Sequence, residues 1–365
     1  MARSTSDTES VAAVHQGIVP SYLLDRLAQS TRFPRAADAA RQTLTIGRPP
    51  RRARIELSID ASGNLVAEVS AAPDRTISDA QNTETLPGVR VRTEDEPPVD
   101  DVAVNEAYDG LGATFELLLS AFGRTSIDGA GAALEATVHF GVDYDNAFWD
   151  GERMVFGDGD GEVFLGFTGS VSIIGHELGH GVIQHTAGLE YQGQSGALNE
   201  SIADVFGALT EQYQRGDTAE DATWLIGGGI FGPAVEGRAL RSMIEPGTAY
   251  DDDQLGRDPQ PAHMRDYVET AEDNGGVHLN SGIPNRAFAL AAIALGGPAW
   301  ERAGLVWYRA LTGGLGPTAT FAEFAEATIA AATAQYGEDS EVSAAVRTAW
   351  TTVGVTVDER GGAGD

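Results

Sequence analysis

Two histidines four residues apart give the chain its clearest chemical signal. His176 and His180 stand in the sequence His-Glu-Leu-Gly-His, with Glu177 between them, and Glu200 follows twenty residues after His180. In an α-helix, residues four apart lie one turn apart on the same face, so both imidazoles can bind one zinc ion. A catalytic zinc site needs three protein ligands and one open position, and Glu200 is the obvious third ligand. The pattern therefore predicts a zinc centre at His176, His180 and Glu200.

Two more carboxylates have predicted roles beside these ligands. Glu177 lies next to the metal-binding face, where it can take a proton from a water molecule as a general base. Asp204 lies one helical turn beyond Glu200, where it can orient a ligand histidine through the free ring N–H. A buried helix that carries such polar groups needs partners for them, and a metal ion supplies one. The flanking residues have the apolar spacing of a buried helix: Ile173, Ile174, Leu178, Val182 and Ile183.

Composition and charge exclude several classes of protein. The 365 residues include 54 acidic and 24 basic residues, and the formal net charge is −30. This acidity argues against nucleic acid or an anionic membrane as a partner. No cysteine is present, which excludes a disulfide framework, and no apolar run approaches the roughly 18 residues of a membrane span. With 42% hydrophobic residues, the chain is typical of a soluble enzyme of two lobes, and we expect a monomer.

Charge is unevenly distributed along the chain. Residues 1–55 contain nine arginines and four acidic residues, a net charge of +5, whereas residues 56–365 have a net charge of −35. A basic leader on an acidic body predicts an intramolecular partner, so we interpret residues 1–54 as a propeptide in cis, with a disordered basic tail as the alternative. Residues 51–54 (RRAR) are a candidate protease-sensitive linker. The alternating apolar pattern that follows predicts a hairpin, so residues 55–74 belong either to the leader or to the mature enzyme.

Several longer strings follow one another along the chain. They are DAQN at 79–82, VAVNEAYDG at 102–110, NAFW at 146–149, GDGDG at 157–161, HELGH at 176–180, NESIAD at 199–204, ALRSM at 239–243 and GGVHLNSGI at 275–283. In sequence and order they resemble the thermolysin family of zinc metalloendopeptidases, and the protealysin-like branch with a short propeptide most closely. The leader string IVPSYLL at 18–24 also resembles that branch, with Ser21 in place of a second proline.

The resemblance implies an α+β fold with two lobes and an active-site cleft between them. The N-terminal lobe, residues 75–186, is expected to be β-rich and to end in the zinc-binding helix. Residues 187–357 are expected to form a helical C-terminal lobe, followed by a disordered tail at 358–365. Apolar spacing itself predicts helices at residues 101–123, 285–295, 298–312, 320–336 and 340–353.

The resemblance also implies catalytic roles for three residues beyond Glu177. Tyr191 and His278 match the family positions that flank the developing oxyanion, and Asp273 matches the carboxylate that orients the histidine. From its residue type alone, Tyr191 could equally be an ordinary buried tyrosine. His278 follows Gly275 and Gly276, which let the backbone run close to a ligand.

Residues that bind the substrate are implied in the same way. Asn146 and Ala147 match residues that hold the substrate backbone as an added strand. Arg241 matches a residue that bonds a substrate carbonyl, although it could instead be a surface ion-pair partner. The matching walls of the pocket after the scissile bond are apolar, so that pocket is expected to prefer Leu, Ile or Phe: Phe164, Phe167, Ile173 and Leu240.

Zinc is the expected cofactor, whereas the sequence does not favour calcium. Ser172 stands where the family's paired calcium site has an acidic residue, and the acidic loop after Glu211 is shortened. We therefore do not expect a double calcium site, and even a single one is in doubt. The GDGDG turn lacks the ligand spacing and terminal glutamate of an EF-hand, so we interpret it as structural.

The favoured function is a neutral zinc endopeptidase made as a zymogen, acting on protein or peptide substrates. It is expected to use a metal-activated water with Glu177 as general base, and to prefer an apolar residue on the amine side of the scissile bond. Secretion is expected, although residues 1–16 contain no apolar stretch of a signal peptide, and the alternative is a cytoplasmic enzyme until release. Two competing functions are a non-catalytic zinc-stabilised binding protein, disfavoured by Glu177 and His278, and another zinc hydrolase such as an aminopeptidase, disfavoured by the string at Asn146.

Overall fold

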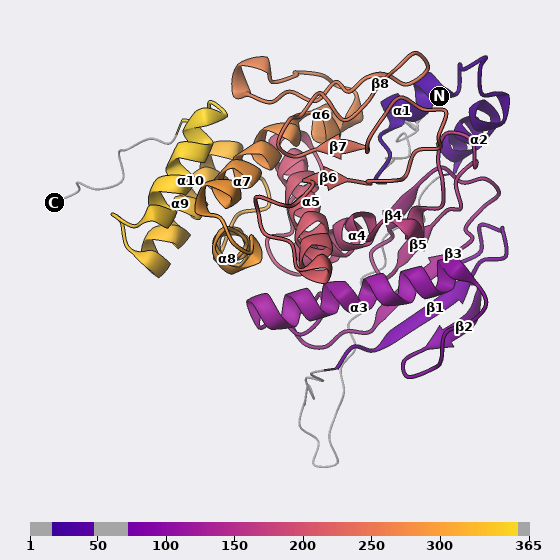
Figure 1. The fold of residues 1–365 in the computed structure, drawn as a ribbon, viewed down its shortest axis with the longest axis horizontal. Helices are drawn as coiled ribbons and strands as arrows, with labels where there is room; N and C mark the ends of the chain where they lie inside the picture. Colours follow the sequence, from indigo (N-terminus) through magenta and orange to yellow (C-terminus); the bar gives the residue numbers. More distant parts are fainter. Residues whose placement is uncertain (1–16, 47–71, 357–365) are drawn as a thin grey trace, which may run out of the picture.

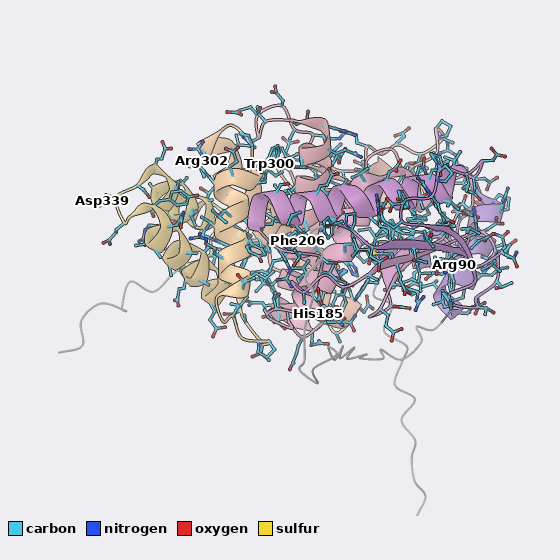
Figure 2. All side chains as sticks on the ribbon, turned by 90° about the horizontal axis from the view of Figure 1, so that it is seen from below. Arg90, His185, Phe206, Trp300, Arg302 and Asp339 are labelled. Carbon is cyan, nitrogen blue, oxygen red and sulfur yellow. The ribbon has the colours of Figure 1, made fainter. Side chains whose placement is uncertain are left out.

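The computed structural model describes residues 17–46 and 72–356. Figure 1 shows two lobes on either side of the central helices α4 (Val171–Gln184) and α5 (Gly193–Arg215). The long axis of the molecule runs from Arg90 in the sheet to Asp339 in the helical lobe (Figure 2). The predicted RRAR linker, the hairpin after it and the C-terminal tail lie outside the described residues.

The N-terminal lobe is built on a five-stranded mixed sheet. The strand order is β2-β1-β3-β5-β4, in which β1, β3 and β5 are parallel and the antiparallel strands β2 and β4 form the two edges. Parallel strands need a long crossover connection, and the chain runs from β1 to β3 through β2 and α3. The bounds are β1 Arg75–Asp79, β2 Val89–Thr93, β3 Leu134–Val138, β4 Ala147–Trp149, β5 Met154–Phe156 and α3 Val102–Phe122.

Helix α3 lies across this sheet, as Figure 1 shows. Asp101 caps its first turn by accepting hydrogen bonds from the backbone N–H groups of Ala103 at 2.9 Å and Val104 at 3.3 Å. Gly123 ends the helix in the left-handed conformation, with φ of 63°. The helix predicted at residues 101–123 is therefore confirmed.

The two central helices pack closely because glycines stand at their contacts. An ideal Cβ on Gly207 of α5 would lie 2.3 Å from the carbonyl oxygen of Ser172 in α4. One on Gly179 of α4 would lie 2.9 Å from the Cα of Ala203 in α5. Larger residues would force the helices apart. The close approach brings the zinc-motif face of α4 next to the face of α5 that carries Glu200.

The C-terminal lobe is a helical bundle around an aromatic core. Trp307 and Trp350 are stacked with ring centroids 5.9 Å apart, and Phe288 and Phe324 contact Trp307 edge-on. The helices predicted from residue 285 onwards are present, and a π-helical turn, η3, precedes α8. The bounds are α6 Asp273–Asn280, α7 Gly282–Leu295, η3 Trp300–Gly304, α8 Leu305–Thr312, α9 Phe321–Tyr336 and α10 Glu341–Thr352.

Short strands and turns connect α5 to α6. β6 pairs with β7 and β8 pairs with β9, each pair antiparallel. These elements and the two 3₁₀ turns are η1 Phe167–Gly169, β6 Leu225–Ile226, β7 Arg241–Ser242, β8 Asp251–Asp252, β9 Gly256–Arg257 and η2 Met264–Asp266. Among the described residues, no helix is both long and apolar enough to cross a bilayer.

The described part of the leader forms two helices that dock on the body. α1 (Ser21–Leu27) lies beside the β8 region, and α2 (Pro34–Thr45) lies over the N-terminal lobe (Figure 1). Leu23, Leu24 and Leu27 of α1 are at most 1% exposed. The leader is therefore folded on the body of the protein and is not a free tail over residues 17–46.

Candidate metal centre and substrate cleft

The three predicted metal ligands meet where α4 and α5 pack together. His176 and His180 project from one face of α4, and Glu200 projects from α5. The Nε2 atoms of the two histidines are 3.1 Å apart. The carboxylate oxygens of Glu200 lie 3.6 Å from Nε2 of His176 and 3.5 Å from Nε2 of His180.

In each histidine, the hydrogen bond at Nδ1 determines whether Nε2 is available to bind a metal ion. Nδ1 of His176 is 2.7 Å from Oδ1 of Asp204, and Nδ1 of His180 is 2.7 Å from Oδ1 of Asn199. Asn199 is oriented by its own amide group, which donates to the carbonyl of Leu189. Because both oxygens accept, both Nδ1 atoms donate, so Nε2 of each ring is the nitrogen that can bind a metal ion.

This donor set fits a zinc ion. Two lone pairs and a carboxylate so close together repel one another unless a cation lies between them. Tetrahedral zinc, with bonds of about 2.0–2.2 Å, places its ligand atoms about 3.3–3.6 Å apart, close to the distances found here. Burial would raise the pKa of Glu200, but His278, His180 and His176 lower it to about 2, so the ligand is anionic at neutral pH.

A buried network connects the metal ligands to the cleft through Asp204. Its carboxylate accepts from His176, from Nε and Nη2 of Arg241 at 2.9 and 2.8 Å, and from Nδ2 of Asn285 at 2.8 Å. Burial opposes the charge of Asp204, yet Arg241 and His176 hold the pKa of its carboxyl well below the usual range. Arg241 is only 2% exposed, so the alternative of a surface ion-pair partner is wrong.

His278 is held in position by the turn that begins α6. Asn274, Gly275 and Gly276 have φ values of 50°, 82° and 76°, in the left-handed region, and they fold Asp273 back onto the histidine. Asp273 accepts from Nδ1 of His278 at 2.6 Å and from its backbone N–H at 2.8 Å. Burial would lower the pKa of His278, but Glu200 and Asp273 raise it to about 9. The ring is therefore protonated at neutral pH and can donate from both nitrogens.

Tyr191 and Glu177 complete the group of side chains around the ligands. The hydroxyl of Tyr191 donates to Glu200 and lies 3.2 Å from Nε2 of His278, so it is a member of the site and not an ordinary core tyrosine. Glu177 is fully buried on α4, next to His176. The structure thus brings all the predicted catalytic residues to one place.

The cleft beside the metal centre contains the chain's own leader. The N–H of Ile18 donates to the carbonyl of Ala147 at 3.0 Å, along the outer edge of β4. The side chain of Asn146 accepts from the N–H of Val19 at 2.9 Å and donates to its carbonyl at 3.1 Å. Nη1 of Arg241 donates to the carbonyl of Ile18 at 3.0 Å. The residues predicted to hold a substrate backbone therefore hold the backbone of a peptide segment, which lies beside the edge strand β4.

The predicted pocket walls are buried and apolar, and so is Ile18 of the leader. Ile18 is 0% exposed and belongs to the same apolar cluster as the four wall residues. The ring centroids of Phe164 and Phe167 are 5.9 Å apart. The wall residues are all buried: Phe164, Phe167, Ile173 and Leu240.

The residues considered for calcium have other partners. Oγ of Ser172 lies 3.0 Å from Oγ of Ser170 and accepts from the N–H of Gly227 at 3.1 Å. Glu211 forms an ion pair with Arg215 at 2.5 Å, so a guanidinium neutralises its charge.

The GDGDG turn is held by hydrogen bonds within the lobe. Asp158 accepts from Nδ1 of His139 at 2.8 Å, while Nε2 of the same ring is 2.8 Å from Asp101 at the start of α3. Asp160 accepts from the N–H groups of Glu162 and Val163 at 2.6 and 2.8 Å. These bonds agree with the structural role predicted for the turn.

Sequence reasoning missed two residues of the site. Asn199, which orients His180, directly precedes Glu200 on α5, so the NESIAD string contained a signal for it. Asn285, which donates to Asp204, comes from α7, and its spacing in the sequence gave no indication of this contact.

Comparison with known proteins agrees with this geometry. Residues 67–184 match the family described as "Thermolysin metallopeptidase, catalytic domain", and residues 187–355 match "Thermolysin metallopeptidase, alpha-helical domain". An extracellular metalloprotease of Pectobacterium carotovorum subsp. carotovorum is 53% identical over 285 residues, which cover 78% of this chain and 82% of that protein. Protease PrtS of Photorhabdus sp. (strain Az29) is 45% identical over 349 residues, which cover 94% and 93%.

A solved structure is similar over nearly the whole length. The precursor of protealysin, a metalloproteinase from Serratia proteamaculans, has 47% sequence identity and a TM-score of 0.84, and the match covers 94% of this chain and 100% of that one. The predicted fold, with its β-rich lobe, central helices and helical lobe, is that of these relatives. The chain therefore belongs to the thermolysin family and is a zinc metalloendopeptidase.

Proposed function

We propose that the enzyme cuts peptide chains next to an apolar residue, with Glu177 as general base, and that its leader keeps it inactive as a propeptide. One observation carries this proposal: a peptide segment lies along the cleft, and its backbone meets Ala147, Asn146, Arg241 and His278. These contacts read the backbone of a peptide and are independent of its side chains. Proteins and peptides are therefore the substrate class.

Each group of residues in the site has a separate role in hydrolysis. Zinc, held by His176, His180 and Glu200, would acidify a water molecule and polarise the scissile carbonyl. Glu177 takes a proton from the attacking water and passes it to the leaving amine. The protonated ring of His278, oriented by Asp273, donates from Nε2 to the carbonyl oxygen as negative charge develops there.

Specificity depends on the residues that follow the scissile bond. Ala147 accepts the N–H of the first residue after that bond, and Arg241 binds its carbonyl. Asn146 then holds the next residue through both backbone groups. The predicted wall residues and Ile18 are all buried and apolar, which favours an apolar side chain at the first position, because filling such a pocket with Leu, Ile or Phe releases water from apolar surface.

The leader would act as a propeptide because it occupies the place of a substrate. We assign residues 1–54 to this propeptide and leave residues 55–74 between it and the mature enzyme, whose lobes are residues 75–186 and 187–357. The Pectobacterium relative is named as extracellular, which supports secretion of this enzyme. We propose a monomer that carries its inhibitor in cis and binds zinc, and we do not assign it calcium.

The test is digestion of an unstructured protein by the purified full-length chain, with zinc or with a chelator, followed by mass spectrometry of the products. We expect cuts before Leu, Ile or Phe that require the metal. The Glu177→Gln variant should not make these cuts, whereas the exposed Glu338→Gln variant should behave like the parent. Metal-independent cleavage, or equal activity of Glu177→Gln, would refute the proposal.

A further inference from the structure

One peptide bond of the leader lies where a scissile bond would lie. The carbonyl oxygen of Gly17 is 3.1 Å from Nε2 of His278, the ring that donates to the reacting carbonyl. The next residue, Ile18, gives its N–H to Ala147 and its carbonyl to Arg241, at 3.0 Å each. The bond between Gly17 and Ile18 is therefore fixed on both sides, with the apolar residue on its amine side.

We infer that Gly17–Ile18 is a cleavage site for the enzyme's own active site, cut in cis at the start of processing. This inference rests on the proposed function, because it uses the same cleft and general base. It names a substrate, a position and an order of events that the function alone does not supply. The relevant bond is present in every copy of the chain, so the reaction needs no second molecule.

The reaction is an ordinary peptide hydrolysis. The oxygen of one water molecule adds to the carbonyl carbon of Gly17 while Glu177 takes one of its protons. The C–N bond to Ile18 then breaks, and the departing nitrogen receives that proton. The water's other proton, left on the new carboxylic acid at Gly17, then passes to the amino group, so the products are a carboxylate at Gly17 and a protonated amino group at Ile18, and no oxidant or other reactant is required.

The leader is tightly packed at the residue before this bond. An ideal Cβ on Gly17 would lie 2.5 Å from Oδ1 of Asn146 and 2.7 Å from its Cγ and Nδ2. That side chain cannot easily move away, because it is bonded to both backbone groups of Val19 and to the N–H of Ala147. A larger residue at position 17 would therefore displace either the leader or Asn146 from this register.

The cut leaves the cleft occupied. Residues beyond the bond are held by α1 and α2, through the buried leucines of α1 and through Thr43, whose Oγ1 accepts from the N–H of Asp145 at 3.0 Å. A second cut, between residues 46 and 72, is needed to separate this docked part from the catalytic lobes. Cleavage at Gly17–Ile18 would thus mark a processed but still inhibited form, with Ile18 as its N-terminus.

The experiment follows the intact mass and the N-terminal sequence of the chain over time. The full-length protein is purified with a chelator, zinc is added, and the reaction is repeated over a hundredfold range of protein concentration. We expect an N-terminus at Ile18, and the released peptide of residues 1–17, at a rate independent of concentration. The Gly17→Val variant should lose at least about tenfold in this rate. The exposed leader variant Gln29→Ala should cut like the parent.

Two further samples separate the outcomes. The Glu177→Gln chain, mixed with fully processed active enzyme, should remain uncut at Gly17–Ile18, since that bond is docked in its own cleft. Once the leader is removed, the Gly17→Val enzyme should hydrolyse an external peptide like the parent. If the parent cleaves external peptides but never shows an Ile18 terminus, or shows it only in proportion to its concentration, the inference is wrong while the proposed function survives. If zinc-loaded protein cleaves no peptide at all, both fail.

Discussion

Replacing Asp204 by asparagine tests how far the metal centre depends on its buried support. In the parent, the carboxylate receives four hydrogen bonds, from His176, from two nitrogens of Arg241 and from Asn285. Asparagine has nearly the same shape but only one acceptor oxygen. If that oxygen remains beside His176, the new NH₂ group faces Nε of Arg241 and the amide of Asn285, which are both donors.

The cost follows from these contacts. Neutralising one partner of a buried ion pair typically costs about 3–5 kcal/mol, and Arg241 is only 2% exposed. The amide of Asn285 can turn over and accept from the new NH₂ group, which recovers about 1 kcal/mol. We therefore expect a loss of about 2–4 kcal/mol of stability, equivalent to a fall in Tm of roughly 5–10 °C. Zinc affinity should fall about 10–100-fold, because a neutral oxygen holds His176 less firmly.

Two assays measure these quantities. Thermal unfolding of the metal-free Glu177→Gln background avoids self-digestion and reports stability, and competition with a chromophoric chelator reports zinc affinity. The exposed Asp339→Asn variant, in the turn between α9 and α10 (Figure 2), is the matched control and should change neither. If Asp204→Asn binds zinc and unfolds like the parent, the buried network does not support the site as argued.

Three further predictions concern other parts of the molecule. The Glu177→Gln variant should keep its zinc in metal analysis but lose about 10²–10⁴-fold in kcat, because an amide cannot accept the proton of the attacking water; parent-like turnover would contradict this. The hydrogen bond from His139 to Asp158 raises the pKa of its imidazole; burial lowers it, the hydrogen bond to Asp101 raises it again, and the result is about 9. Its stabilisation is therefore complete below about pH 6.5 and lost as the pH rises through about 9, so His139→Gln should cost about 1 kcal/mol at about pH 6, after allowance for solvent screening, and much less at about pH 9.5 in thermal unfolding. The same cost at both pH values would refute the assignment. Because Arg215 already neutralises Glu211, calcium should change the Tm of the parent no more than that of Glu211→Gln, and a rise confined to the parent would reveal a calcium site.

Local pattern was sufficient to predict the centre of the active site. His176, Glu177 and His180 are fixed relative to one another by a single helix, so their spacing alone gives their geometry. Glu200 and Asp204 are likewise fixed to each other by α5. The sequence could not show how α4 and α5 approach each other, which depends on glycines such as Gly207 at the contact. The resemblance to the family, and not the spacing, supplied that step.

Contacts between distant elements were harder to predict. Arg241 stands in a short strand and could have been a surface residue, until the fold placed it between Asp204 and the leader. Asn285 reaches Asp204 from another helix across 81 residues of sequence. Neither residue type nor spacing indicates such a partner, because many polar residues of a helix face solvent. Only the packing of α7 against α5 makes the contact.

The leader docks on the body as its charge predicted, but charge contributes little to the docking. Its positive charge predicted docking on the acidic body, but the described leader and body share one ion pair between carboxylate and guanidinium, Arg35 with Asp143 at 2.8 Å. That pair is largely exposed, and such pairs contribute about 0–1 kcal/mol. By contrast, Ile18, Leu23 and Leu24 are almost fully buried, and each such side chain contributes about 1.5–3 kcal/mol. Apolar burial and the backbone bonds in the cleft therefore account for the docking, and the charge difference contributes mainly to long-range attraction.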